Sequence, residues 1–117
     1  MLKSISLENY KCFKKKTDIE IAPLTVLCGV NSSGKSSILK SLLMLKQSYE
    51  SSSNGNFLAL NGKYTNNGTF KDVVNGRKGS LFKISNSFEI KNGTYMTTQE
   101  KNLLKDINSV FQCKNKE

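Results

Sequence analysis

The feature that most constrains this chain is an eight-residue segment, GVNSSGKS at positions 29–36, which matches the pattern G-x-x-x-x-G-K-[ST] in full. The apolar stretch LTVLC at 24–28 leads into it, and SSILKSLL at 36–43 leaves it with apolar residues at helical spacing. An apolar strand, a glycine-containing loop and a helix, in that order, form the setting in which this pattern binds phosphate. The alternative is an ordinary glycine turn before a helix.

The spacing of the two glycines gives the loop its chemistry. Gly29 and Gly34 have no Cβ, so the backbone can wrap closely around an anion. The loop amides then point inward, and the following helix directs its positive end toward the same anion. We expect Lys35 to reach the β- and γ-phosphates of a nucleotide and Ser36 to place its hydroxyl on Mg²⁺.

Length and charge limit the protein class. The chain has 117 residues, which suffices for one domain, or part of one, with a modest core. Its 18 Lys+Arg against 9 Asp+Glu give a net charge of +9, which favours anionic partners such as nucleotide or nucleic acid. A general bias toward lysine explains the charge equally well, because the lysines are scattered. The chain has no histidine, which excludes catalysis by histidine and metal binding through histidine.

The cysteines and the hydropathy pattern indicate the environment. Cys12, Cys28 and Cys113 lack the paired spacing of a disulfide framework or a zinc site. Cys28 is expected to be a small buried residue. No segment approaches a membrane span of 18 apolar residues, and the N-terminus lacks the apolar stretch of a signal peptide. We therefore expect a cytoplasmic location and no membrane contact.

Hydrophobic periodicity predicts the elements around the loop. Alternation predicts strands over about 2–8 and 17–22, with a hairpin-like connection between them. A third strand over 24–28 is apolar on both faces and is expected to be central and covered on both sides. The helix should run to about Tyr49, with Ile38, Leu42, Leu45 and Tyr49 on one stripe.

The second half of the chain has a different character. A mobile loop is expected over 51–56, and five Asn-Gly dipeptides favour antiparallel hairpins. Short strands are predicted over 57–60, 81–84, 88–90 and 95–97, a helical turn over 72–74 closed by Gly76, and a C-terminal helix over 98–117. The predicted fold class is α/β, with a mixed sheet and an antiparallel β patch.

Three segments resemble the opening of ABC/SMC/RecF-type ATPase heads: ISLENYKCF at 5–13, IEI at 19–21 and LTVLCGVNSSGKSSIL at 24–39. LALNGKY at 58–64 and GTFKDVV at 68–74 are similar to bacterial AAA-type ATPases with ABC-like heads, which occur in OLD-like, Septu-type and retron-associated antiphage systems. The resemblance covers about residues 1–80. It implies part of a P-loop NTPase fold, with ATP and Mg²⁺ as cofactors.

The resemblance also implies roles for single residues. The phosphates and Mg²⁺ would lie on the loop and the first residues of its helix: Gly29, Asn31, Ser32, Ser33, Gly34, Lys35, Ser36 and Ser37. Ser32 stands where ABC proteins often have glycine. Lys11 lies where these proteins often place a basic residue near the nucleotide, and Tyr10 or Phe13 could contact base or ribose. The alternatives are a surface lysine and two core aromatics.

Hydrolysis needs an additional acidic element that holds Mg²⁺ and positions water. In the resembling family this is an apolar strand ending in Asp-Glu, but no two acidic residues are adjacent in this chain, and no L-S-G-G-like signature is present. Gln47 is expected on the helix surface, and no catalytic residue is identified. The chain is therefore an N-terminal piece of a longer protein, a natural short protein that acts without hydrolysis or through a partner, or a remnant of a frameshifted gene.

Our leading interpretation is the ATP- and Mg²⁺-binding N-terminal lobe of an ABC/SMC-like ATPase over 1–117, incomplete for hydrolysis alone. The complete head would dimerise around two nucleotides, with a role linked to DNA or to antiphage defence. The alternative is a short, non-enzymatic nucleotide-binding module that docks to a partner protein. A small-molecule P-loop kinase fits less well, because Arg77 is the single arginine and an arginine-rich lid is lacking.

Overall fold

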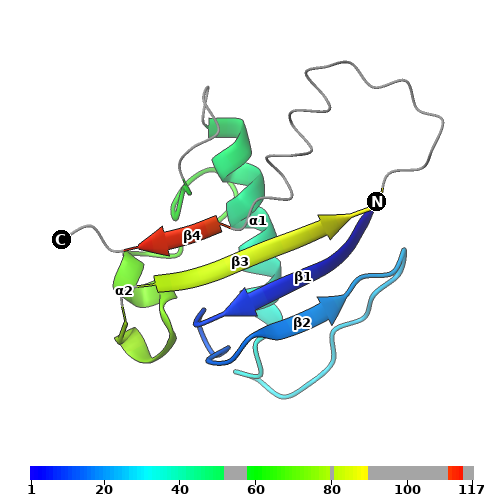
Figure 1. Cartoon of the computed structure of the whole chain (residues 1–117), viewed down its shortest axis with the longest axis horizontal. Coiled ribbons are helices and arrows are strands. Elements are labelled where there is room, and N and C mark those ends of the chain that lie inside the picture. Colours follow the sequence, from blue (N-terminus) through cyan, green and yellow to red (C-terminus); the bar gives the residue numbers. More distant parts are fainter. Residues whose placement is uncertain (52–57, 80, 90–110, 115–117) are drawn as a thin grey trace.

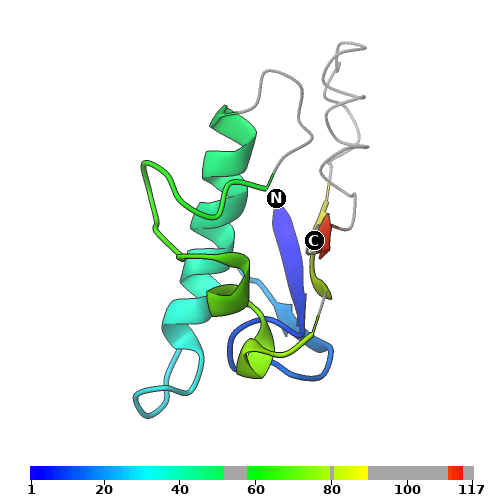
Figure 2. The same ribbon diagram turned by 90° about the vertical axis from the view of Figure 1, so that its left-hand side faces the viewer.

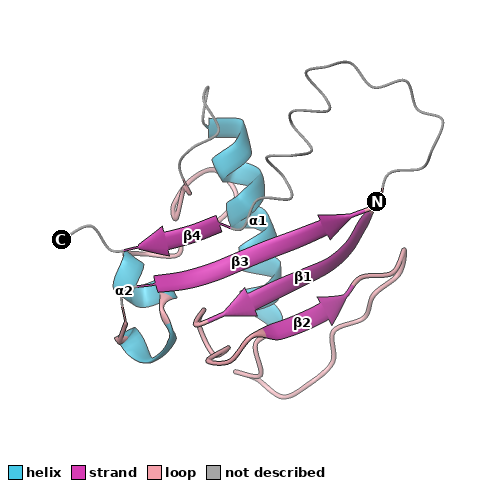
Figure 3. Cartoon of the chain, in the orientation of Figure 1, coloured by secondary structure: helices cyan, strands magenta, loops and turns pink. Residues whose placement is uncertain are grey.

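The computed structural model describes residues 1–51, 58–79 and 81–89, together with the backbone of 111–114. Its four strands form one sheet in the order β2-β1-β3-β4, and helix α1 lies along one face of that sheet (Figures 1 and 2). The elements in chain order are β1 Leu2–Glu8, β2 Thr17–Glu20, α1 Lys35–Ser51, α2 Phe70–Val73, the 3-10 helix η1 Asn75–Arg77, β3 Leu81–Phe88 and β4 Phe111–Lys114 (Figure 3).

Strand β1 is an inner strand of the sheet. It pairs antiparallel with β2, with Ile5 opposite Ile19, and antiparallel with β3, with Leu7 opposite Ile84. Its alternation places Ile5 and Leu7 in the core, where they meet Phe82 and Ile84 of β3. The predicted pair of N-terminal strands and their hairpin-like connection are confirmed. The α/β class is confirmed too, but the expected mixed sheet is not found, because all pairings among the described strands are antiparallel.

The predicted central strand over 24–28 is wrong. Residues 24–28 adopt no strand, and the side chains of Leu24 and Val26 are 83% and 72% exposed. Cys28, expected to be buried, is exposed as well. A strand that is apolar on both faces needs neighbours at both edges and cover on both faces. The described part of the chain supplies no strand that pairs with this segment, so Leu24 and Val26 remain at the surface, while Leu27 is half-buried against the core.

Part of the second half also differs from expectation. Two short strands were expected over 81–84 and 88–90, whereas β3 is continuous from Leu81 to Phe88 because it pairs along its length with β1. Residues 58–60 form no strand. Residues 111–114 form β4, paired antiparallel with β3, so the predicted helix over 98–117 is wrong there. Non-local pairing at the edge of β3 overrides the helical spacing of that segment.

Several predictions fall on other residues. The mobile loop over 51–56, the strand over 95–97 and the rest of the C-terminal helix lie wholly or mainly outside the described residues. The short helical turn near 72–74 is confirmed by α2 and η1. Gly76 has a φ of 63°, the left-handed backbone that closes such a turn.

Helix α1 buries polar as well as apolar side chains. Ile38 and Met44 join the core, while Tyr49, predicted on the buried stripe, is 48% exposed. Gln47, expected at the surface, is only 1% exposed. Its Nε2 donates to the carbonyl of Ala59 at 2.7 Å, and its Oε1 accepts from the amides of Tyr64 and Thr65 at 3.3 and 3.0 Å.

This glutamine fastens residues 58–67 to the helix. The hydroxyl of Ser48 adds a fourth contact by accepting from the amide of Ala59 at 2.7 Å. Segment 58–67 contains no strand or helix, and its own backbone bonds join Gly62 to Thr65 and Asn67 to Leu60. The amides of Ala59, Tyr64 and Thr65 and the carbonyl of Ala59 depend on the side chains of α1 for hydrogen bonds. The buried face of α1 is consequently more polar than its sequence pattern predicts.

We expect Gln47→Leu to destabilise the fold by about 2–4 kcal/mol, because three buried or partly buried backbone groups would lose their partner. Urea unfolding followed by circular dichroism measures the change. Lys40→Leu is the matched control on the exposed side of α1, and its effect should stay within about 0.5 kcal/mol. A loss below about 1 kcal/mol for Gln47→Leu would contradict the role of this side chain.

Candidate functional site

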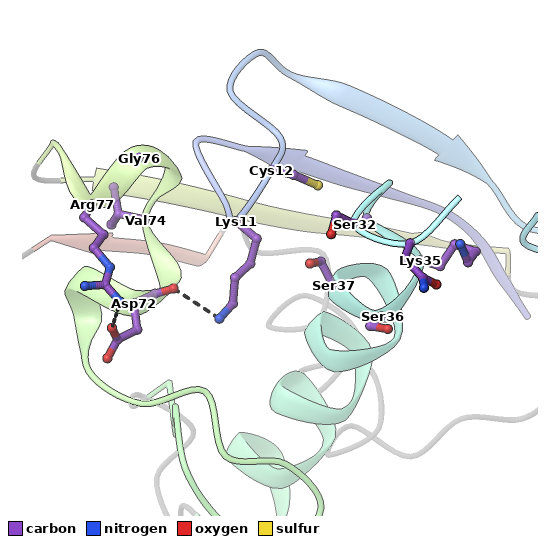
Figure 4. A pocket seen from close by; sticks show the side chains of 12 residues that line it. Lys11, Cys12, Ser32, Lys35, Ser36, Ser37, Asp72, Val74, Gly76 and Arg77 are labelled. Atoms are coloured by element: carbon purple, nitrogen blue, oxygen red, sulfur yellow. Dashed lines mark hydrogen bonds and ion pairs between the residues drawn. The ribbon is translucent and has the colours of Figure 1, made fainter. Parts of the chain in front are cut away.

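A cavity of about 420 Å³ lies between the glycine loop and the α2–η1 segment. The loop and the start of α1 form one wall, the turn after β1 forms the roof, and α2 with η1 forms the opposite wall (Figure 4). Its lining comprises Lys11, Cys12, Asn31, Ser32, Gly34, Lys35, Ser36, Ser37, Asp72, Val74, Gly76 and Arg77.

The backbone of the loop has the conformation that its glycines predict. The φ angles of Gly29 and Gly34 are 149° and 99°, values that side chains rarely permit. Ser32 also has a positive φ, 70°, a backbone conformation that favours glycine. Helix α1 begins at Lys35, so the amides of its first turn have no acceptor within the helix and are available to an anion.

Lys35 folds back onto the loop. Its ammonium group donates to the carbonyls of Gly29 and Val30, the latter at 2.7 Å, and to the hydroxyl of Ser33 at 3.3 Å. These contacts hold one positive charge at the centre of the loop. A phosphate bound in the loop would lie beside this charge and could exchange with the carbonyls as its partner.

The other predicted loop residues are close to the cavity but not equally placed. Asn31, Ser32, Ser36 and Ser37 line it, and Gly34 is buried at its edge. Gly29 and Ser33 do not line it. They act on Lys35 instead, as acceptors for its ammonium group.

Lys11, predicted near the nucleotide, does lie in the cavity. Its Nζ donates to the carbonyl of Asp72 at 3.1 Å, and its side chain runs between the two walls (Figure 4). Burial lowers the pKa of Lys11, the nearby Lys40 ammonium lowers it further, and the Asp72 carboxylate opposes both effects. Its φ of 50° turns the backbone so that its amide bonds the carbonyl of Val73 at 2.7 Å.

Tyr10 and Phe13, the two aromatics of the same turn, have structural positions. Tyr10 is fully buried and packs against Phe82 in a tilted arrangement with ring centroids 5.9 Å apart, and burial raises the pKa of its phenol. It does not line the cavity, so the core alternative holds for it. Phe13 is half-buried, and its ring covers the backbone of Gly34. A Cβ built on Gly34 would lie 2.6 Å from this ring and 2.7 Å from the Cys12 sulfur.

The α2–η1 wall is the part of the site that our reading of the sequence did not predict. Thr69 donates its amide and its hydroxyl to Asp72 Oδ2, at 2.8 and 2.9 Å, and Arg77 pairs with Asp72 Oδ1 at 3.4 Å. The hydrogen bonds from the Thr69 backbone and side chain, with smaller help from Arg77, hold the pKa of Asp72 below its ordinary value. The available signal was the capping-box spacing of Thr69 and Asp72, three residues apart before Val73-Val74.

Asp72 is the sole carboxylate among the cavity-lining residues, and both of its oxygens are engaged by Thr69 and Arg77. Across the residues that the structure describes, no three His, Cys, Asp or Glu side chains gather as a metal site. Among the described residues, the cavity therefore offers cations and backbone amides that could bind an anion. Its one carboxylate, Asp72, is already bound by Thr69 and Arg77.

Comparisons with known proteins gave one match. A family model described as AAA ATPase domain matches residues 1–117. No curated protein and no solved structure matches the chain. Among the described helices, none has the length and apolar character needed to cross a membrane.

We expect Gly34→Ala to destabilise the protein by about 2–4 kcal/mol, because its φ of 99° is strained for alanine and the methyl group would meet Cys12 and Phe13. The matched control is Gly76→Ala, where φ is 63° and a Cβ would meet nothing within 4 Å. It should cost about 1 kcal/mol. Denaturant unfolding measures the free energy of unfolding of both variants. Equal losses of stability would show that Cys12 and Phe13 do not pack tightly on Gly34.

Proposed function

The chain belongs to the AAA ATPase domain family, and we propose that it binds the triphosphate of ATP on the loop and helix start at residues 29–37. The observation that carries the proposal is the joint placement of Lys35, the free amides of α1 and the positive-φ Gly34 at one end of a single cavity. Family membership supports a nucleotide as the ligand. The lysines behind the net charge of +9 are scattered along the chain, so we confine the proposal to nucleotide.

The cavity suits this ligand in size and chemistry. Its volume of about 420 Å³ lies in the range of small-molecule sites, roughly 300–1,000 Å³. A Cβ on Gly29 would lie 2.8 Å from the Ser33 hydroxyl and 3.9 Å from Lys35 Nζ, so a side chain there would crowd the cradle. The residues present therefore fit a polyphosphate.

We assign roles to the chain's own groups. Lys35 neutralises the terminal phosphates, and Asn31, Ser32, Ser37 and the loop amides donate hydrogen bonds. Ser33 holds the Lys35 ammonium group in place by accepting from it. Lys11 adds a second cation between the two walls. The Ser36 hydroxyl, exposed in the first turn of α1, is the group suited to Mg²⁺. When bound, Mg²⁺ would neutralise charge on the phosphates.

We further propose that the chain corresponds to the N-terminal lobe of an ABC/SMC-like ATPase. The resemblance of residues 5–13 and 24–39 supports this assignment. Asp72 is the one carboxylate among the cavity-lining residues, and Thr69 and Arg77 already bind its oxygens. Hydrolysis would then require carboxylates from further sequence or from a second chain.

A second candidate is a nucleotide-binding module that acts by docking to a partner. The exposed apolar side chains of Leu24, Val26 and Val30, at 83%, 72% and 79%, favour a protein surface next to the loop. Both candidates need the same nucleotide-binding site at residues 29–37. They differ in whether the bound nucleotide is consumed.

Titration calorimetry with ATPγS and Mg²⁺ tests the proposed nucleotide-binding site. We expect binding by the unaltered chain and at least about tenfold weaker binding by Lys35→Ala, because a charge-assisted contact to phosphate is lost. Lys14→Ala is the matched control, since Lys14 is exposed and lies outside the cavity lining. Equal heats from Lys35→Ala and the unaltered chain would remove the loop from the proposed function.

Phosphate release from ATP separates hydrolysis from binding. We expect no steady turnover by the chain alone, because the cavity has no free carboxylate among its lining residues. The measurement is continuous detection of inorganic phosphate over many potential turnovers. Sustained hydrolysis that disappears in Lys35→Ala would contradict the proposed incompleteness.

A further inference from the structure

The α2–η1 wall faces the loop across the same cavity, with Lys11 between them (Figure 4). The phosphate end of a nucleotide has its attachments at the loop. Its nucleoside end must therefore extend from the loop, and within this cavity the opposite boundary is formed by Asp72, Val74, Gly76 and Arg77. None of these four residues belongs to the G-x-x-x-x-G-K-[ST] pattern.

The chemistry of this wall suits a flat heteroaromatic ring. Val74 is 3% exposed and gives an apolar base. A Cβ on Gly76 would meet nothing within 4 Å, so open space adjoins this residue. Arg77 follows with an exposed side chain, and a guanidinium plane stacks favourably on aromatic rings. Asp72 restrains this guanidinium through the 3.4 Å ion pair.

The wall also has a fixed position relative to the loop. The amide of Asn75 donates to the carbonyl of Asn9 at 3.0 Å, and its side-chain Nδ2 donates to the carbonyl of Lys11 at 2.6 Å. Lys11 returns a bond from its amide to Val73. The turn that makes these bonds is the one whose Cys12 and Phe13 cover Gly34.

We propose that Val74, Gly76 and Arg77 form the nucleoside subsite, with the Arg77 guanidinium stacked on the nucleobase. This inference rests on the proposed function, because it requires the phosphates to lie on the loop. Arg77 would then determine preference for a nucleotide over a bare polyphosphate. Asp72 would be a positioning residue that acts through Arg77.

The test compares ATPγS with tripolyphosphate, each with Mg²⁺, by titration calorimetry on the full chain. We expect Arg77→Ala to weaken ATPγS binding by about tenfold and to leave tripolyphosphate within about twofold. Arg77→Lys should lose nearly as much, because a lysine keeps the charge but not the plane. Lys78→Ala is the matched control, since Lys78 is the next residue, is exposed and does not line the cavity.

A second variant guards against a folding artefact. Arg77 has a φ of 56°, which glycine adopts without strain, so Arg77→Gly should fold and repeat the loss seen with alanine. Unchanged ATPγS binding by Arg77→Ala and Arg77→Gly would overturn the subsite while leaving the loop intact. Equal weakening of both ligands would overturn it too, by placing Arg77 on phosphate. Failure of the unaltered chain to bind either ligand would reject the proposed function and the subsite together.

Discussion

The structure depends on the turn between β1 and β2, which holds the glycine loop and residues 73–75 in fixed positions. On one side Cys12 and Phe13 press on the backbone of Gly34, where even a methyl group would clash. On the other side Asn9 and Lys11 exchange backbone hydrogen bonds with residues 73–75. Both of these turn residues adopt positive φ angles, a local cost that the surrounding contacts offset. The cavity exists because this turn separates its two walls by a fixed amount.

Local sequence patterns were sufficient for the elements whose partners lie nearby. The first two strands, the helix that starts at Lys35 and the positive-φ glycines of the loop follow from alternation, helical spacing and the need for a close backbone approach. The lining position of Lys11 followed from a resemblance rather than from a pattern, since one lysine in a turn has no distinguishing periodicity. The roles of these residues toward a nucleotide remain predictions.

Features that depend on distant partners could not be predicted. Residues 24–28 have the composition of a buried strand, but composition does not say whether neighbouring strands are present. Gln47 looks like a surface residue by type, and only the folded path of residues 58–65 shows that three backbone groups need it. Arg77 was noted as the single arginine, yet its place opposite the loop arises from hydrogen bonds that join residues more than sixty positions apart.

The two ends of the glycine loop are secured differently. Its far end continues into α1 and lies under Phe13, whereas its near end continues into residues 24–28, which have no ladder partner in the described part of the chain. Ordering Gly29 and Val30 around a ligand must then draw on the ligand's own interaction energy. A strand that pairs with residues 24–28 would order the loop before the ligand binds. It would thereby raise the affinity for phosphate without contacting the phosphate itself.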